Sequence, residues 1–265
     1  MHAAFLTRSQ LGPRLSALAR LCGQGQRVVD VGCDHSLLSL ALLESGHFQE
    51  ALAIDIQEEP LRRAQERLDR WIATDKLPAE LATRIHYQQN DGLADLSLRA
   101  DDCLVIAGMG GMEIHKILGQ TQPDGLAENR IVLSPQRSQT ELLYALMSQG
   151  AAPEQYLMEQ DGYRYLLLRV EGVPFSGEIP LRDPESIRRL YSFTCDADTL
   201  SPETRLRFLK QQKKRLRYDL QAASRFTSDA REETQRMHPA RAAYLAYLSQ
   251  AEVQASAQTV LKEDV

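Results

Sequence analysis

The sequence predicts a doubly wound, Rossmann-like α/β sheet that ends in an antiparallel hairpin, followed by a small all-α, coiled-coil-like domain. Three observations support this. Five apolar strand segments alternate with helical segments through about residue 150, two β-rich runs follow, and the chain then becomes polar and helical. We therefore expect two domains, at residues 1–175 and 185–265.

The alternating strands and helices come in a regular order. Strands are predicted at residues 27–31, 51–54, 84–88, 103–107 and 130–134, and helices at 11–21, 60–71, 112–118 and 139–149, with a further helix that opens directly after the turn at His35 and runs to about residue 44. Gly46 suits the left-handed residue that ends a helix, and Pro60 suits a first turn, where its missing N–H costs nothing. Strands joined through helices in this way run parallel.

The hairpin is predicted from residues 154–159 and 163–170, which flank the two-residue turn signal Asp161-Gly162. A doubly wound sheet with this ending is typical of class I methyltransferases and is lacking in most dehydrogenases. Prolines 174, 180 and 184 then mark the domain boundary. Leucines follow in a heptad pattern, interrupted by a lysine at one core position, at Leu206, Leu209, Lys213, Leu216 and Leu220.

The composition indicates a soluble cytoplasmic protein. The chain has 265 residues, 43% hydrophobic and 25% charged. It shows no run near the ~18 apolar residues of a membrane span and no secretory leader, so we expect no membrane partner. The four cysteines lack C-x-x-C spacing, so we expect reduced thiols and no metal site. A monomer is favoured, although the sequence does not fix the oligomeric state.

The net charge of -5 argues weakly against a nucleic-acid partner, but one segment has the opposite character. Residues 205–217 contain seven basic side chains and no acidic one. Such a block fits contacts to phosphates, and the alternative interpretation is a solvated helix face.

The turn after the first strand, Gly32-Cys33-Asp34-His35, favours a cationic cofactor. Asp30 and Gly32 end the strand, and glycine allows a ligand to approach the backbone. Two glycines of the G-x-G-x-x-G fingerprint are missing, which disfavours a pyrophosphate. Asp34 instead adds negative charge suited to S-adenosylmethionine, which carries a sulfonium and an ammonium group. The alternative for Asp34 is a helix N-cap.

The next two strand ends offer groups for an adenosine. Asp55, followed by Ile56, stands where a carboxylate accepts the ribose hydroxyls of a nucleotide cofactor. Asp91-Gly92 can contact the adenine amino group and let the ring pass close to the backbone. A plain turn is the alternative for this pair.

The loop after the fourth strand, Ala107-Gly108-Met109-Gly110-Gly111, is the candidate acceptor site. We assign Ala107 and Gly108 also to the cofactor. The chain lacks the Asn/Asp-Pro-Pro-aromatic box that grips an exocyclic amine, so a ring nitrogen is the expected nucleophile. Packing of the following helix is the alternative for this loop. His35 is a candidate catalytic residue, with a cap or packing role as its alternative.

At these residues the chain resembles the bacterial tRNA (adenine-N1)-methyltransferases that act on the D-loop adenine at tRNA position 22. The similar pieces follow the family's order and are Arg14-Leu15, residues 30–35, residues 91–93, residues 106–111, Pro135 and Asp161-Gly162. The resemblance implies that Gly32, Asp34, His35, Asp55, Asp91 and Gly92 line the S-adenosylmethionine site. It also implies that residues 108–111 and the turn at Pro135 and Gln136 face the target base.

The chemistry of adenine sets the expected mechanism. N1 has an in-plane lone pair, so alignment matters more than a general base, and Asp34 or the carbonyls of the glycine loop can stabilise the positive charge formed on the ring. The base must be unpaired or turned outward. Basic side chains are expected to hold the tRNA phosphates, at Arg8, Arg14, Lys213, Lys214 and Arg215.

Three other functions compete with this prediction. The chain could methylate another RNA position, a small molecule or a protein. It could be a nicotinamide-dependent oxidoreductase, which the incomplete glycine fingerprint disfavours. It could also be a non-catalytic RNA-binding protein on a decayed methyltransferase fold, against which the retained Asp55, Asp91 and glycine loop argue.

Overall fold

A computed structural model of the chain describes residues 11–121, 125–173 and 194–195, together with Leu206, Lys210 and Lys214. The chain divides into two compact units, Met1–Tyr156 with Tyr165–Ile179, and Leu157–Arg164 with Pro180–Val265. Of the expected heptad, Leu206 is described and helical, and the other positions lie outside the described residues.

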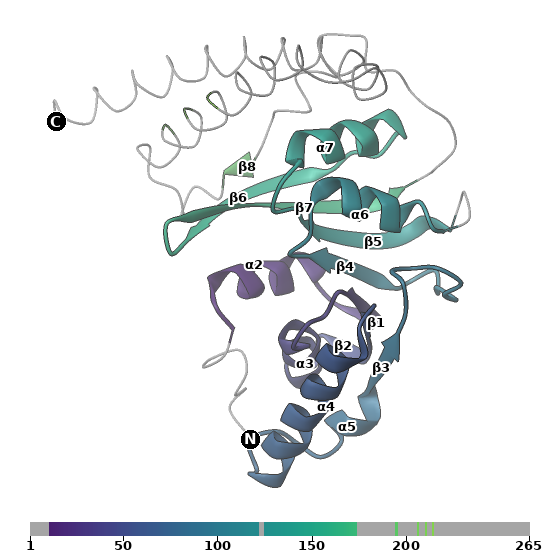
Figure 1. Ribbon diagram of the computed structural model, residues 1–265, viewed down its shortest axis with the longest axis vertical. Coiled ribbons are helices and arrows are strands. Elements are labelled where there is room, and N and C mark those ends of the chain that lie inside the picture. Colours follow the sequence, from purple (N-terminus) through teal and green to yellow (C-terminus); the bar gives the residue numbers. More distant parts are fainter. Residues whose placement is uncertain are drawn as a thin grey trace, which may run out of the picture. The chain divides into compact units, whose positions relative to one another are not determined.

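The described elements follow the predicted alternation (Figure 1). The helices are α2 (Pro13–Cys22), α3 (Leu37–Glu44), α4 (Glu58–Ala73), α5 (Leu81–Arg84), α6 (Gly111–Leu118) and α7 (Gln139–Ser148). The strands are β1 (Gly25–Val31), β2 (Phe48–Asp55), β3 (Ile85–Gln89), β4 (Cys103–Ala107), β5 (Leu126–Ser134), β6 (Glu154–Gln160), β7 (Tyr163–Val173) and β8 (Thr194–Cys195).

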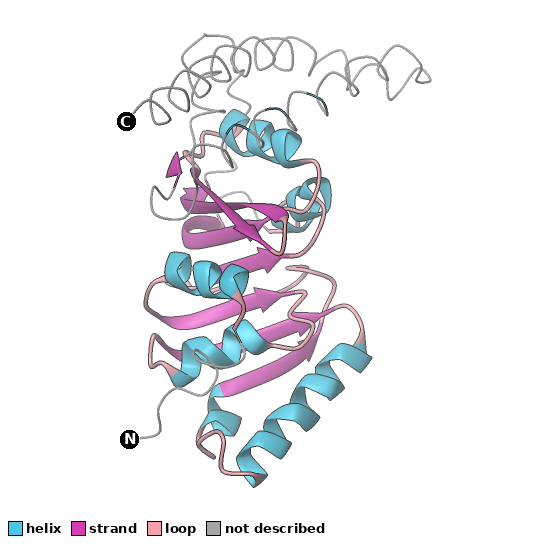
Figure 2. Ribbon diagram, turned by 90° about the vertical axis from the view of Figure 1, so that its left-hand side faces the viewer, coloured by secondary structure: helices cyan, strands magenta, loops and turns pink. Residues whose placement is uncertain are grey.

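The sheet has the strand order β3-β2-β1-β4-β5-β7-β6-β8. Strands β1 to β5 pair in parallel, and β7 is antiparallel to β5. Figure 2 shows the strands with helices packed along the sheet, and α6 lies beside α7. The chain moves outward from β1 to β3 and then returns to β4 on the other side of β1. This confirms the predicted Rossmann-like sheet, with its switch point between β1 and β4.

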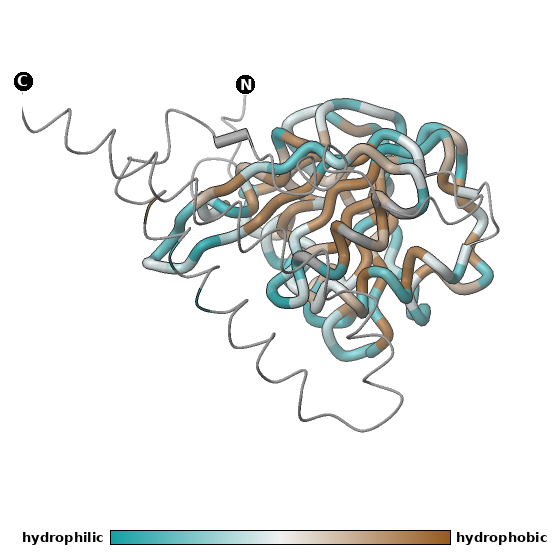
Figure 3. Tube along the Cα trace, turned by 90° about the horizontal axis from the view of Figure 1, so that it is seen from above, coloured by the Kyte–Doolittle hydropathy of each residue, from teal (hydrophilic) through white to brown (hydrophobic). Residues whose placement is uncertain are grey.

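The centre of the sheet is apolar apart from the buried Asp30 of β1. Val28 and Val29 of β1 and Leu104, Val105 and Ile106 of β4 have no exposed surface. Parallel strands covered on both faces show such apolar runs, and Figure 3 shows brown segments in the middle of the chain trace with paler and teal segments around them. Helix α3 is nearly as apolar, since every residue from Leu38 to Leu43 is buried. The core therefore fixes the strand ends on which the site depends.

Several boundaries differ from the prediction. Strand β2 begins at Phe48 rather than at residue 51, because Gly25 pairs with Phe48 and a Cβ at Gly25 would lie 2.8 Å from the Phe48 ring. Strand β5 begins at Leu126, which pairs with Val173 after an irregularity in the register. The short helix α5 was not predicted. Gly46 has φ +74° and donates its N–H to the Leu43 carbonyl, which confirms its role at the helix end.

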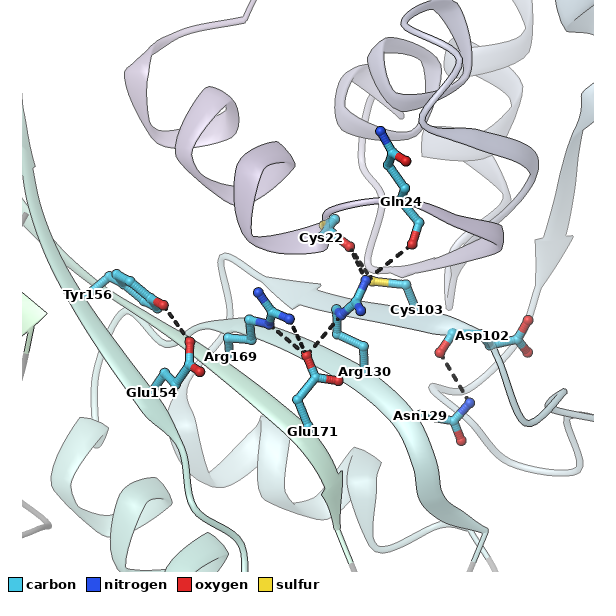
Figure 4. A network of polar contacts seen from close by, with 10 residues as sticks. All are labelled: Cys22, Gln24, Asp102, Cys103, Asn129, Arg130, Glu154, Tyr156, Arg169 and Glu171. Carbon is cyan, nitrogen blue, oxygen red and sulfur yellow. Dashed lines mark hydrogen bonds and ion pairs between the residues drawn. The ribbon is translucent and has the colours of Figure 1, made fainter.

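Polar contacts join the segments near the amino ends of the central strands. Arg27 at the start of β1 donates from Nε to Oδ1 of the fully buried Asp102, just before β4, at 2.7 Å. Arg130 at the β5–β7 pair donates from Nη1 to the Cys22 carbonyl at 2.8 Å and from Nε to Glu171 Oε1 at 3.0 Å (Figure 4). These contacts connect neighbouring segments at the amino-terminal edge of the sheet, opposite the edge where the parallel strands end.

Three cysteines, Cys22, Cys33 and Cys103, are free and buried. Burial raises the pKa of the Cys33 thiol well above its ordinary value, which disfavours the thiolate. Over the described part of the chain, no three His, Cys, Asp or Glu side chains gather where a metal could bind. Within the same residues, no helix is long and apolar enough to cross a membrane.

The Arg27–Asp102 pair is expected to matter for stability. In Asp102→Ala, Arg27 keeps its charge in a largely buried position but loses its carboxylate partner, so we expect the free energy of unfolding to fall by about 3–5 kcal/mol. Urea unfolding measures this. The control is Glu59→Ala, which removes exposed ion pairs with Arg62 and Arg63 on α4 and should leave stability unchanged. Equal stability of the two variants would contradict the expectation.

Candidate functional site

The register of the parallel strands brings the predicted site residues to one edge of the sheet. Val31 of β1 pairs with Ile54 of β2 and with Ile106 of β4. Each of these positions is followed by a predicted site residue. These residues, Gly32, Asp55 and Ala107, therefore lie side by side at the edge of the sheet. Strand β3 adds the turn at residues 90–92, because Asp55 pairs with Gln89.

The turn after β1 has an uncommon backbone. Gly32 has φ +71° and donates its N–H to the Ile54 carbonyl at 2.8 Å. Asp34 and Ser36, on either side of His35, both lie in the left-handed region, with φ +47° and +50°. Left-handed residues other than glycine cost energy and gather at functional sites. The buried Ser36 holds this turn, since its hydroxyl lies 3.2 Å from the phenol oxygen of Tyr87 on β3.

Asp34 presents its carboxylate to solvent. Helix α3 has Ser36 as its N-cap residue and no side-chain cap bond, so the N-cap alternative for Asp34 is wrong. The Asp34 side chain is 73% exposed, and its Oδ1 lies 3.6 Å from His35 Nδ1. An exposed carboxylate at the carboxyl edge can attract a cation without displacing another partner. The imidazole lies beside it without a hydrogen bond from Nδ1 to any of the described residues.

Asp30 is buried rather than presented to a ligand. Its Oδ2 accepts a hydrogen bond from the Ser39 hydroxyl of α3 at 2.7 Å. Desolvation is the largest cause that raises the pKa of Asp30 to about 6, and the Asp55 charge adds to it. Asp30 therefore joins β1 to α3 beneath the site.

The ends of β2 and β3 form a second part of the edge. Asp55 Oδ1 accepts the Gln57 N–H at 3.0 Å, and the Asp55 carbonyl accepts the Asn90 N–H at 3.0 Å. Ile56 between them is 60% exposed, which is high for a large apolar side chain. An exposed apolar side chain beside a carboxylate suits a flat ring attached to a sugar.

The turn at Asp91-Gly92 is set by local packing. Asp91 is exposed, and Gly92 is buried with φ +59°. A Cβ at Gly92 would lie 2.4 Å from Oε1 of Gln120, the atom that accepts the Leu93 N–H at 2.8 Å. A side chain at position 92 is therefore excluded by local packing, a cause that neither the ligand role nor the plain-turn alternative included, while the Asp91 side chain is exposed.

The glycine loop after β4 is bonded to the loop after β5. The Gly108 N–H donates to the Ser134 carbonyl at 3.1 Å, and the Gln136 N–H donates to the Met109 carbonyl at 2.8 Å. A Cβ at Gly111 would lie 2.2 Å from the Ser138 carbonyl oxygen, so this glycine serves the packing of α6. At Gly108 a Cβ would meet only the Gln136 side chain, at 3.8 Å. Room for a ligand is therefore found at Gly108.

Met109 connects the glycine loop with the turn after β1. Its terminal methyl group lies 2.0 Å from the position that a Cβ on Gly32 would take. The two loops that the sequence assigned to cofactor and acceptor are therefore in contact. A side chain at Gly32 would strike this methionine, and φ +71° disfavours one independently.

The predicted substrate-binding residues differ in their burial and in their contacts. Pro135 is buried and Gln136 is exposed beside the glycine loop. The Arg14 guanidinium lies 5.4 Å from the centre of the Tyr165 ring, a cation–π contact with β7. Lys214 is helical and exposed. Arg8, Lys213 and Arg215 lie outside the described residues.

Sequence analysis missed two residues of this edge, Ser36 and Tyr87. Their hydroxyls support the turn around His35 although they are 51 positions apart. A serine after a histidine does not by itself indicate a functional residue. Tyr87 lies in a predicted strand and has nothing in its local sequence that distinguishes it from other strand residues. Burial raises the pKa of Tyr87 to about 12, so its hydroxyl keeps its proton at neutral pH.

Comparison with known proteins places the fold among methyltransferases. Residues 11–168 match the methyltransferase-domain family. The tRNA (adenine(22)-N(1))-methyltransferase of Bacillus subtilis is 26% identical over 163 residues, which is 61% of this chain and 65% of that protein. The matched segment thus spans slightly less than two thirds of this relative.

Solved structures show the same fold. The B. subtilis m1A22 tRNA methyltransferase TrmK aligns with a TM-score of 0.64 at 21% identity, over 92% of this chain and 99% of that one. The structure of M. capricolum TrmK with S-adenosyl-homocysteine aligns with a TM-score of 0.59 at 16% identity, over 90% and 98% of the two chains.

The buried Asp30 predicts a pH dependence of stability. Its pKa is about 6 in the folded protein against 3.8 for an ordinary aspartate, so folding holds this proton more tightly. Asp30 therefore weakens folding as the pH rises from about 4 to 6, by on the order of 3 kcal/mol at pH 7.5. Asp30→Asn cannot ionise, so its unfolding free energy relative to the parent should be higher at pH 7.5 than at pH 4 by that amount.

Urea unfolding at the two pH values measures this difference. The exposed Asp69→Asn on α4 is the matched control and should show no such change with pH. If Asp30→Asn behaves like the control, Asp30 does not carry a raised pKa.

Proposed function

The chain belongs to the methyltransferase-domain family, and we propose that it transfers the methyl group of S-adenosylmethionine to N1 of an adenine in tRNA. The observation that carries this proposal is the contact between the turn at Gly32 and the glycine loop at Met109, which sets a donor site beside an acceptor site. The similarity to an enzyme named for adenine 22 supports that position as the target.

The residues of the carboxyl edge fit the donor. The exposed Asp34 carboxylate is available to its ammonium group, and the proximity of His35 can orient this carboxylate. Asp55 can accept the ribose hydroxyls, while Ile56 offers an apolar surface to the adenine ring and Asp91 a carboxylate to its amino group. Asp30, Gly32, Gly92 and Ala107 shape this site through the backbone. When bound, the donor supplies an activated methyl group on its sulfonium.

The glycine loop is proposed to bind the target base. Gly108 leaves room for a flat ring, and the loop carbonyls at Gly108 and Gly110 can accept from its edge. Because adenine N1 attacks with an in-plane lone pair, the loop needs only to align the base, and no side chain must remove a proton. Asp34 and these carbonyls then stabilise the positive charge on the ring. Met109 lies where donor and base meet.

The body of the tRNA requires a second surface. We assign it to Arg8 and Arg14, to the turn at Pro135 and Gln136, and to the basic residues Lys213, Lys214 and Arg215, of which Lys214 is exposed. Residues 185–265 are proposed to form a helical domain that carries this basic block, after a first domain of residues 1–175 closed by a β6–β7 hairpin. The turn residues Asp161 and Gly162 both have positive φ, which supports the hairpin. The chain is proposed to act on tRNA as a monomer in the cytoplasm.

One assay tests the proposed activity. The protein is incubated with labelled S-adenosylmethionine and unmodified tRNA, and the product is mapped by nuclease digestion and mass spectrometry. We expect 1-methyladenosine in the D-loop. Asp55→Ala should bind the donor at least about tenfold more weakly, because it removes one charge-assisted hydrogen-bond acceptor, and the exposed Glu58→Ala on α4 should not. Methylation at another RNA position or of no RNA would contradict the proposal.

The basic block is tested by removing its charge. We expect Lys213→Ala/Lys214→Ala/Arg215→Ala to weaken tRNA binding and to lower the salt dependence by about 0.9 for each phosphate that the variant no longer neutralises. Donor affinity should stay the same. The control with equal loss of charge is Arg62→Ala/Arg63→Ala/Arg70→Ala on α4. Unchanged tRNA affinity in the first variant would remove the block from the binding surface.

A further inference from the structure

Arg137 lies between β5 and α7, beside the glycine loop, and has no part in the donor and acceptor sites described so far. Its side chain crosses Gly110, since Nε lies 3.1 Å and Cγ 3.4 Å from the position of a Cβ on that glycine. The absence of a side chain at Gly110 therefore lets the arginine stem lie directly on the loop proposed to hold the target base. Arg137 itself is exposed.

The backbone at Arg137 is held firmly. Its carbonyl accepts the Gly111 N–H at 2.7 Å, and Gly110 and Arg137 form an isolated parallel bridge. The Gln139 side chain donates to the Pro135 carbonyl at 3.0 Å, which closes the turn from the other side. These bonds fix the position of the Arg137 backbone beside the glycine loop, so the arginine side chain starts next to the proposed acceptor site.

The charge of Arg137 is uncompensated within the described part of the chain. Seven other arginines there form ion pairs with carboxylates, namely Arg27, Arg62, Arg63, Arg99, Arg130, Arg164 and Arg169. Among the described residues, Arg137 has neither an ion pair nor a side-chain hydrogen bond. An exposed guanidinium without an ionic partner beside a proposed site can bind an anion.

The chemistry of the acceptor indicates which anion this is. The adenine ring becomes positively charged during methylation, so an arginine against the ring would oppose the reaction. Arginine also recognises the edge of guanine rather than that of adenine. The backbone phosphate of the target nucleotide is an anion that adjoins the base, and it can accept two N–H groups of a guanidinium at once.

We infer that Arg137 binds a backbone phosphate adjoining the target adenosine, which would hold the turned-out nucleotide against the glycine loop. This inference rests on the proposed function. It concerns a contact within the methyltransferase domain, separate from the basic block at residues 205–217.

The experiment combines protein and RNA changes. Binding of unmodified tRNA is measured over a range of salt concentrations for the parent, Arg137→Gln, Arg137→Lys and the control Arg70→Gln, an exposed arginine on α4. The same proteins are tested with tRNA in which a neutral methylphosphonate replaces the phosphate on either side of the target adenosine. Donor affinity is measured in parallel.

We expect Arg137→Gln to weaken tRNA binding by about tenfold or more and to lower the salt slope by about 0.9, with donor affinity unchanged. Arg137→Lys should retain part of the affinity, and Arg70→Gln all of it. One methylphosphonate should weaken binding by the parent yet cause no further loss in Arg137→Gln, since both changes remove the same ion pair.

Additive losses for both methylphosphonates, an unchanged salt slope, or a parallel loss of donor affinity would each overturn the inference. Its failure is distinguishable from that of the proposed function. If the parent methylates N1 of the adenine while Arg137→Gln binds tRNA equally well, the inference alone fails. If the parent methylates no tRNA adenine, both fail.

Discussion

The parallel register of β1 with β2 and β4 is the constraint on which the rest of the structure depends. Val31, Ile54 and Ile106 are paired, so the three strands end together and their turns meet at one edge. No single turn makes a site by its own sequence. The combination arises because a buried apolar sheet holds the ends in line, and β1 lies at the point where the winding reverses.

Charged side chains at the two edges of the sheet differ in their burial and pairing. Near the amino ends, Arg27 and Asp102 pair in a buried position, and Arg130 binds two carbonyls of the α2–β1 connection. At the carboxyl edge, Asp34 is exposed, and its backbone is left-handed. Strain of this kind persists only where the surroundings enforce it, and here the Ser36–Tyr87 contact and the strand ends provide that support. The Asp34 carboxylate is thus exposed at the edge where the donor is proposed to bind, whereas Arg27 and Asp102 are paired with each other.

The order of strands and helices could be predicted from the sequence because buried parallel strands are continuous apolar runs. The ends of β2 and β5 could not, since Phe48 and Leu126 are fixed by strand partners distant in the chain. The assignment of Asp34 to the donor site stays a prediction, and its alternative as a helix cap could be excluded only from the structure, where Ser36 is the N-cap residue of α3. The burial of Asp30 and the packing roles of Gly92 and Gly111 depend on neighbours that local sequence does not reveal.

The most direct test of the account is a crystal structure of the chain with S-adenosyl-homocysteine. The account predicts that the amino-acid end lies near Gly32 and Asp34, with the ribose hydroxyls on Asp55 and the adenine ring against Ile56. It also predicts that the sulfur faces the glycine loop at Gly108. A ligand bound elsewhere, with Met109 and its neighbours still packed over Gly32, would contradict it.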